Sequence, residues 1–186
     1  MYRLLLLSLL FLTRCADNPP TTPETRPVEN PNAGNTAIYD VDADDPYEIG
    51  DGSFMDMRPG DPLAPFRDFL RPGSLETGEG SFEVHFIAGR RKDTLGYGFS
   101  DDGNTIESIT ITSPDAVTQQ GIRVGNSLSE LRERLGQLEL YGTEVESRVY
   151  ASKPPFRYRL NANAPAGPVD TSAIQSTTEV REIIIE

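Results

Sequence analysis

A fourteen-residue segment of this chain recurs 65 residues later, and this internal repeat constrains the fold more than any other feature. Residues 57–70 align without a gap with residues 122–135, and five of the fourteen aligned pairs are identical. The identical pairs are Arg58 with Arg123, Gly60 with Gly125, Leu63 with Leu128, Arg67 with Arg132, and Leu70 with Leu135. Self-similarity at a fixed offset indicates a duplicated structural unit. The alternative is a chance likeness between two unrelated amphipathic helices.

Each copy predicts a short helix that starts just after its glycine. In the second copy Ser127 and Glu130 have the spacing of a capping box, and Gly136 can end the helix. In the first copy Asp61 can cap and Pro62 suits the first helical position, whereas Pro65 makes the helix start late or run irregularly. The apolar stripes expected to pack on a sheet are Leu63, Phe66 and Leu70 in one helix, and Leu128, Leu131 and Leu135 in the other.

Alternating apolar residues after each helix predict three strands per copy. They lie near residues 82–86, 95–99 and 106–111 in the first copy, and near 145–150, 156–160 and 180–185 in the second. We therefore predict an α+β fold of two tandem helix-plus-three-strand modules with antiparallel sheets, at residues 47–118 and 119–186. One face of each sheet packs on its helix, and the other is open to solvent or a ligand.

The glycine-led motif Ile122-Arg123-Val124-Gly125-Asn126-Ser127, with Glu130 and Leu131 and a following meander, resembles small envelope lipoproteins of the outer-membrane assembly type. Its tandem form is similar to the β-lactamase-inhibitor protein fold and to a family of bacterial lipoproteins of unknown function. The resemblance covers residues 47–186. It implies a binding scaffold, and it brings no catalytic residues that could be carried over.

The N-terminus carries a second resemblance. Residues 4–12 are apolar apart from Ser8, Arg3 precedes them, and Thr13, Arg14 and the single cysteine Cys15 follow. Nine residues are too few for a span that needs about 20, but they suit the core of a secretory signal. The segment resembles a bacterial lipoprotein signal peptide, which implies a signal at residues 1–14 and lipidation of Cys15. Arg14 departs from the small residue of that pattern, and an ordinary signal peptide is the alternative.

Residues 15–46 are predicted to be the lipidated cysteine and a disordered, proline-rich tether, because they hold six prolines and few large apolar residues. Asp40, Asp42 and Asp44 alternate like the start of a calcium loop. The sixth and twelfth positions hold Asp45 and Asp51 instead of the glycine and glutamate that such a loop needs. We interpret the run as a solvated acidic segment.

Charge and residue content exclude several kinds of function. Without Arg3 and Arg14, 15 basic and 29 acidic side chains remain, and a net charge of −14 repels nucleic-acid phosphates. His85 is the only histidine, so a site that needs two is excluded, and we predict it to be an exposed strand residue opposite Phe82, Val84 and Phe86. The sequence contains neither a nucleophile elbow nor a phosphate loop.

The remaining candidates have simpler interpretations. Asp101-Asp102 occupies a predicted turn, and Arg90-Arg91-Lys92 is predicted to be a solvated hairpin turn that could dock an acidic partner. The glycines of Gly96-Tyr97-Gly98 are predicted to mark a bulge or a close contact.

No catalytic, cofactor-binding or metal-binding residue is therefore predicted, and Cys15 is the one site residue. We expect a lipid-anchored, non-enzymatic binding or scaffold module of the bacterial cell envelope, at the outer membrane or the periplasmic face. It would attach to the membrane through acyl chains on Cys15 and bind an envelope protein through the open sheet face or residues 161–178. The alternatives are a carboxylate-dependent hydrolase of envelope polymers and a small-ligand or ion sensor.

Overall fold

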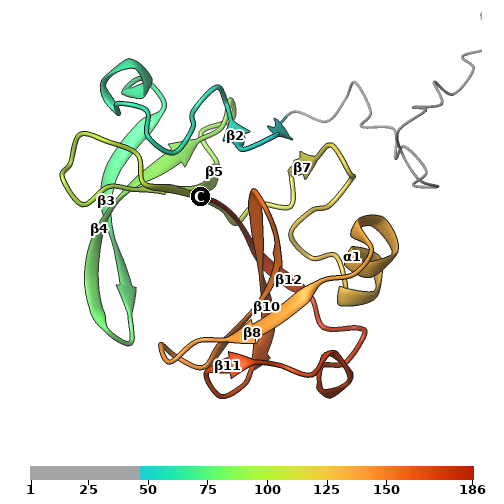
Figure 1. The fold of residues 1–186 in the computed structure, drawn as a ribbon. Coiled ribbons are helices and arrows are strands. Elements are labelled where there is room, and N and C mark those ends of the chain that lie inside the picture. Colours follow the sequence, from blue (N-terminus) through green and yellow to red (C-terminus); the bar gives the residue numbers. More distant parts are fainter. Residues whose placement is uncertain (1–46) are drawn as a thin grey trace, which may run out of the picture. The chain divides into compact units, whose positions relative to one another are not determined.

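The computed structural model describes residues 47–186, and most of this part of the chain is β-structure (Figure 1). The predicted signal peptide, Cys15, the tether and the aspartates at positions 40–45 lie outside the described residues. A nine-stranded sheet has the order β11-β8-β9-β10-β12-β6-β5-β4-β3, and every neighbouring pair is antiparallel. Its strands are β3 (Leu70–Thr77), β4 (Gly80–Ala88), β5 (Thr94–Phe99), β6 (Ser108–Ile111), β8 (Glu139–Gly142), β9 (Arg148–Lys153), β10 (Phe156–Asn163), β11 (Gly167–Pro168) and β12 (Val180–Ile185).

A smaller sheet and three short helical segments complete the described residues. Strand β1 (Tyr47–Gly50) pairs antiparallel with β2 (Ser53–Phe54) and parallel with β7 (Ala116–Thr118). The one α-helix among residues 47–186 is α1 (Leu128–Leu135), and η1 (Ala64–Phe66) and η2 (Thr171–Ala173) are single turns of 3-10 helix.

The predicted α+β class with two separate helix-plus-three-strand modules is wrong. Strand β6 from the first half pairs with β12 from the second half, so that Ile109 faces Ile185 and Ile111 faces Ile183. The two halves therefore form one continuous sheet. The physical reason is that each half would otherwise leave the edge of an isoleucine-rich strand unpaired, and mutual pairing satisfies both edges.

The predicted first helix is also wrong. After the single turn η1, the chain enters strand β3 at Leu70, which was expected to be the last residue of the helix's apolar stripe. Pro62 and Pro65 lack the amides that a longer helix would use, which favours a short turn. The Arg71-Pro72-Gly73 segment is part of β3, and Pro72 is tolerated there because β3 is the edge of the sheet.

The repeat nevertheless appears in the hydrogen bonds of both copies. The Gly60 N–H donates to the Ile106 carbonyl over 2.7 Å, and the Gly125 N–H donates to the Val180 carbonyl over 2.8 Å. The two glycines have φ values of +94° and +96°, a region that side chains disfavour. The duplicated element is therefore a glycine turn. In each copy its N–H is hydrogen-bonded to the chain at or just before the last strand of that half, β6 or β12.

The second copy forms its predicted helix with its predicted cap. The Ser127 side chain accepts from the Glu130 N–H, and the Glu130 side chain accepts from the Ser127 N–H, which completes the capping box. The helix ends at Gly136, also as predicted.

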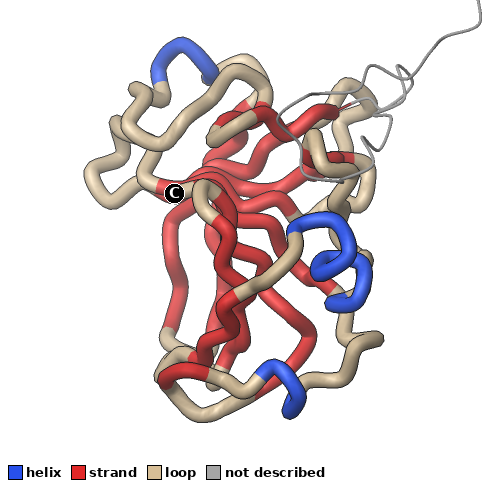
Figure 2. Tube along the Cα trace, turned by 45° about the vertical axis from the view of Figure 1, so that its right-hand side comes forward, coloured by secondary structure: helices blue, strands red, loops and turns tan. Residues whose placement is uncertain are grey.

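The core lies on one side of the nine-stranded sheet, where α1 and the smaller sheet cover it (Figure 2). Leu128 and Leu131 on α1 are fully buried. They belong to the same cluster of buried side chains as Ile109, Ile111, Ile183 and Ile185 of the central strands. The other side of the sheet carries side chains outside this cluster.

Candidate functional site

The side of the sheet opposite the packed core, here called the inner face, carries aromatic and arginine side chains, most of which are partly or fully buried. Cross-strand pairs fix its membership, because directly paired residues point to the same side. Tyr97 pairs with Phe86 and Thr110, and Arg159 pairs with Tyr150 and Glu182. The inner face includes Arg71, Phe82, Val84, Phe86, Tyr97, Phe99, Thr110, Tyr141, Arg148, Tyr150, Arg157, Arg159, Glu182 and Ile184.

The sheet curls so that distant strands approach each other across the inner face. The Gly78 N–H, at the tip of the β3–β4 hairpin, donates to the Glu146 side chain between β8 and β9 over 2.7 Å. Figure 1 shows this green hairpin reaching toward the orange β8 region. Arg148 on β9 also acts electrostatically on Tyr97 of β5. These strands are four positions apart, which would be about 19 Å in a flat sheet. The curl therefore makes the inner face concave.

One end of the inner face is a cluster of two tyrosines and an arginine. The rings of Tyr141 and Tyr150 stack with centroids 5.6 Å apart and planes inclined by 21°. The Arg157 guanidinium lies 5.2 Å from the Tyr150 ring centroid and donates to the Tyr141 hydroxyl over 3.0 Å. Arg157 also forms an ion pair with Glu186. These contacts hold a cationic and aromatic surface in a fixed geometry.

Ion pairs continue across the middle of the inner face. Arg159 donates to Glu182 over 2.8 Å, and Arg148 pairs with Glu146. Burial raises the pKa of Tyr97, and the nearby Glu182 carboxylate raises it further. Tyr97 therefore keeps its hydroxyl proton at neutral pH and can donate a hydrogen bond. This arrangement offers apolar contact and hydrogen-bond donors, which suits binding.

The structure confirms that His85 lies on the side of β4 opposite Phe82, Val84 and Phe86, but the predicted exposure is wrong. His85 is half-buried and lies on the core side of β4 with Ile87, because Phe82, Val84 and Phe86 face the inner face instead of the core. Its Nδ1 atom is buried and has no hydrogen-bond partner. Ile87 could have shown which side of β4 faces the core. It is apolar and lies two residues after His85, so the two side chains share a face, but it follows the alternating segment at residues 82–86.

The predicted turn at Asp101-Asp102 is confirmed, and Asp102 stabilises it. The Asp102 carboxylate accepts from the backbone N–H groups of Asn104 and Thr105, each over 2.7 Å. These bonds lower the pKa of Asp102 to about 2. The carboxylate is therefore committed to the turn.

Other predicted features have local structural roles. Arg91, in the turn between β4 and β5, forms an exposed ion pair with Asp115 at 3.8 Å. A side chain at Gly96 would collide with the backbone carbonyl of Thr110, so the predicted close contact is confirmed. Residues 161–178 contain the end of β10, β11 and η2, and Ile174 from this segment reaches the core.

Residues 47–186 contain no group of three or more His, Cys, Asp or Glu side chains placed to hold a metal ion. In the same part of the chain no helix has both the length and the apolar character of a membrane span.

Comparison with known proteins shows a fold likeness alone. No family model and no curated protein matches the chain. Among solved structures, it is similar to the uncharacterized protein yfeY from Escherichia coli, with a TM-score of 0.54 and 15% sequence identity. The match covers 75% of this chain and 99% of that chain. The resemblances to outer-membrane assembly-type lipoproteins and to the β-lactamase-inhibitor protein fold stay predictions.

Proposed function

We propose that this protein is a lipid-anchored, non-enzymatic binding or scaffold module of the bacterial cell envelope. Acyl chains on Cys15 hold it at the membrane, and the inner face binds an envelope protein. The observation that carries the proposal is the concave inner face, on which tyrosine, phenylalanine and arginine side chains gather opposite the packed core.

The composition of the inner face supports a role in binding. Tyrosine and arginine are enriched at the energetically important centres of protein interfaces. Tyr141, Tyr150 and Arg157 are already held by stacking and hydrogen bonding, so a partner loses little entropy in ordering them. Phe82 at the rim is 37% exposed and adds apolar surface.

Capture of partners from detergent-extracted native envelope tests the binding role. Phe82→Glu places a charge on the inner face without entering the core. We expect it to reduce recovery of the specific partner by about tenfold or more. Gln137→Glu adds the same charge on an exposed residue after α1, and His85→Ala changes the core side of the sheet. Both control variants should capture the partner as the wild type does.

Two results would overturn the proposal. One is equal capture by Phe82→Glu and Gln137→Glu. The other is a turnover activity of the purified protein that His85→Ala or Asp101→Ala abolishes while the fold is preserved. The second result would favour the hydrolase alternative.

Intact mass spectrometry of membrane-extracted protein tests the anchor separately. We expect a lipid adduct on Cys15 and a mature chain that begins there, and Cys15→Ala should release the protein from the membrane. An unmodified Cys15 thiol in the mature wild-type protein would contradict the anchor and leave the binding role to its own test.

A further inference from the structure

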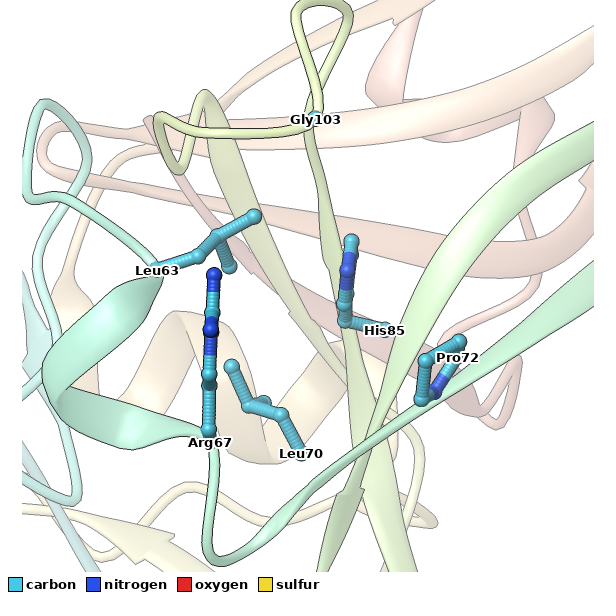
Figure 3. Close-up of a pocket in the computed structure, with 6 residues that line it drawn as sticks. All are labelled: Leu63, Arg67, Leu70, Pro72, His85 and Gly103. Carbon is cyan, nitrogen blue, oxygen red and sulfur yellow. The ribbon is translucent and has the colours of Figure 1, made fainter.

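A pocket of about 340 Å³ opens on the other side of the sheet, at the β3 edge (Figure 3). It is lined by Leu63, Arg67, Leu70, Pro72, His85 and Gly103. Leu63 and Leu70 are buried and Pro72 is exposed, so the floor and one wall are apolar. Figure 3 shows the nitrogen-bearing ends of Arg67 and His85 directed toward the loop that carries Gly103.

Arg67 and the Nδ1 atom of His85, the basic groups of the pocket, form no hydrogen bond or ion pair within residues 47–186. Among residues 47–186, no carboxylate or carbonyl forms a hydrogen bond or ion pair with Arg67. The buried Nδ1 of His85 likewise has no partner. A buried polar atom without a partner costs free energy, so the packing around His85 leaves one of its polar groups unsatisfied.

The register of the sheet explains why there is space beside His85. Its direct cross-strand partner on β5 is Gly98, which has no side chain, and its partner on β3 is Pro72. A Cβ atom added at Gly98 would have only the Ser108 carbonyl oxygen within 4 Å, at 3.9 Å. Glycine at position 98 therefore leaves no side chain directly opposite the imidazole on β5.

The Asp102 carboxylate, next to Gly103 in the chain, forms no ion pair with Arg67 within residues 47–186. Gly103 belongs to the turn that Asp102 stabilises, and the Asp102 carboxylate already accepts two backbone N–H groups. A guanidinium without a protein carboxylate partner, above apolar walls, matches a ligand with one anionic end and a compact apolar body. The overall negative charge of the chain means that any affinity for an anion must come from these local donors.

We propose that this pocket binds a small organic carboxylate, whose anionic group contacts Arg67 and His85 and whose apolar body lies against Leu63, Leu70 and Pro72. The site is independent of the proposed protein-binding surface, because His85 and the inner face lie on opposite sides of β4.

The single histidine makes the test direct, because the full chain gives one imidazole signal in the NMR spectrum. Benzoate is the probe, and benzamide is its neutral control of the same shape. We expect benzoate to shift the His85 imidazole signal saturably, with benzamide binding about tenfold more weakly or not at all.

Two variants with a matched control locate the binding. Arg67→Gln should weaken benzoate binding about tenfold, whereas Arg71→Gln should not, since Arg71 pairs with Phe86 on the inner face. Gly98→Val should also abolish binding by filling the space beside His85 while leaving Arg67 and His85 in place. Its amide spectrum shows whether it folds.

The proposal is overturned if the His85 signal shows no saturable change up to about 50 mM benzoate. A dissociation constant above that concentration would be far too weak for a specific site. Equal responses to benzoate and benzamide would also overturn it. So would equal affinities of the Arg67→Gln and Arg71→Gln variants. None of these results bears on partner capture by the inner face.

Discussion

The repeat aligns Phe66 with Leu131, yet the structure predicts very different costs for truncating them. Leu131 lies on α1 and is fully buried in the core cluster, so Leu131→Ala should leave a cavity and cost about 2–5 kcal/mol. Phe66 is half-buried in η1, and its ring packs on Phe69 with centroids 5.9 Å apart. Because solvent can fill the vacated space, Phe66→Ala should cost about 1–2 kcal/mol despite the larger side chain.

Urea unfolding of the full chain measures this difference. The protein has no tryptophan, so far-UV circular dichroism and the fluorescence of its seven tyrosines are the signals. With a slope of about 2 kcal/mol per M, a loss of about 3 kcal/mol lowers the midpoint by about 1.5 M. The corresponding shift for Phe66→Ala is about 0.5–1 M. Equal shifts with unchanged slopes, or a cost for Leu131→Ala below about 1 kcal/mol, would refute this reasoning.

Three further predictions concern backbone and cap. Gly96→Ala should cost about 1–3 kcal/mol of stability, because the added Cβ meets the Thr110 carbonyl. Gly98→Ala should change the stability little, and thermal melts compare the two variants. Ser127→Ala should cost about 1 kcal/mol in the same melts by removing the cap of α1. Hydrogen bonds from Ser127 lower the pKa of Glu130 below its ordinary value of 4.5. The ionised Glu130 carboxylate therefore contributes fully to stability above pH 4.5, and this contribution is lost as the pH falls through the lowered pKa. The difference in stability between the wild type and Ser127→Ala should therefore become smaller in acid. A stability difference that does not depend on pH would contradict this prediction.

The sequence predicted the local elements where short-range chemistry decides the backbone. The capping box of Ser127 and Glu130, the helix end at Gly136 and the turn at Asp101-Asp102 all depend on contacts within a few residues. The strands with alternating apolar residues, such as β4 and β12, were also located, because alternation fixes which side chains share a face.

The sequence could not give the elements that depend on partners far along the chain. Strand β3 was missed because its proline and glycine favour a turn unless β4 is present to pair with it. The role of His85 was missed for a related reason. Alternation separates two faces, but it does not say which of them a helix will cover.

The amino-acid sequence by itself determined the duplication, the glycine turns at Gly60 and Gly125, and the one α-helix within residues 47–186, because backbone conformation and capping act over a few residues. The tertiary structure decided that the two halves share one sheet through β6 and β12. It also decided that the sheet curls until Gly78 meets Glu146, which makes the inner face concave. The physical reason is that edge pairing and sheet curvature depend on strands more than sixty residues apart, whose mutual preference no local pattern records.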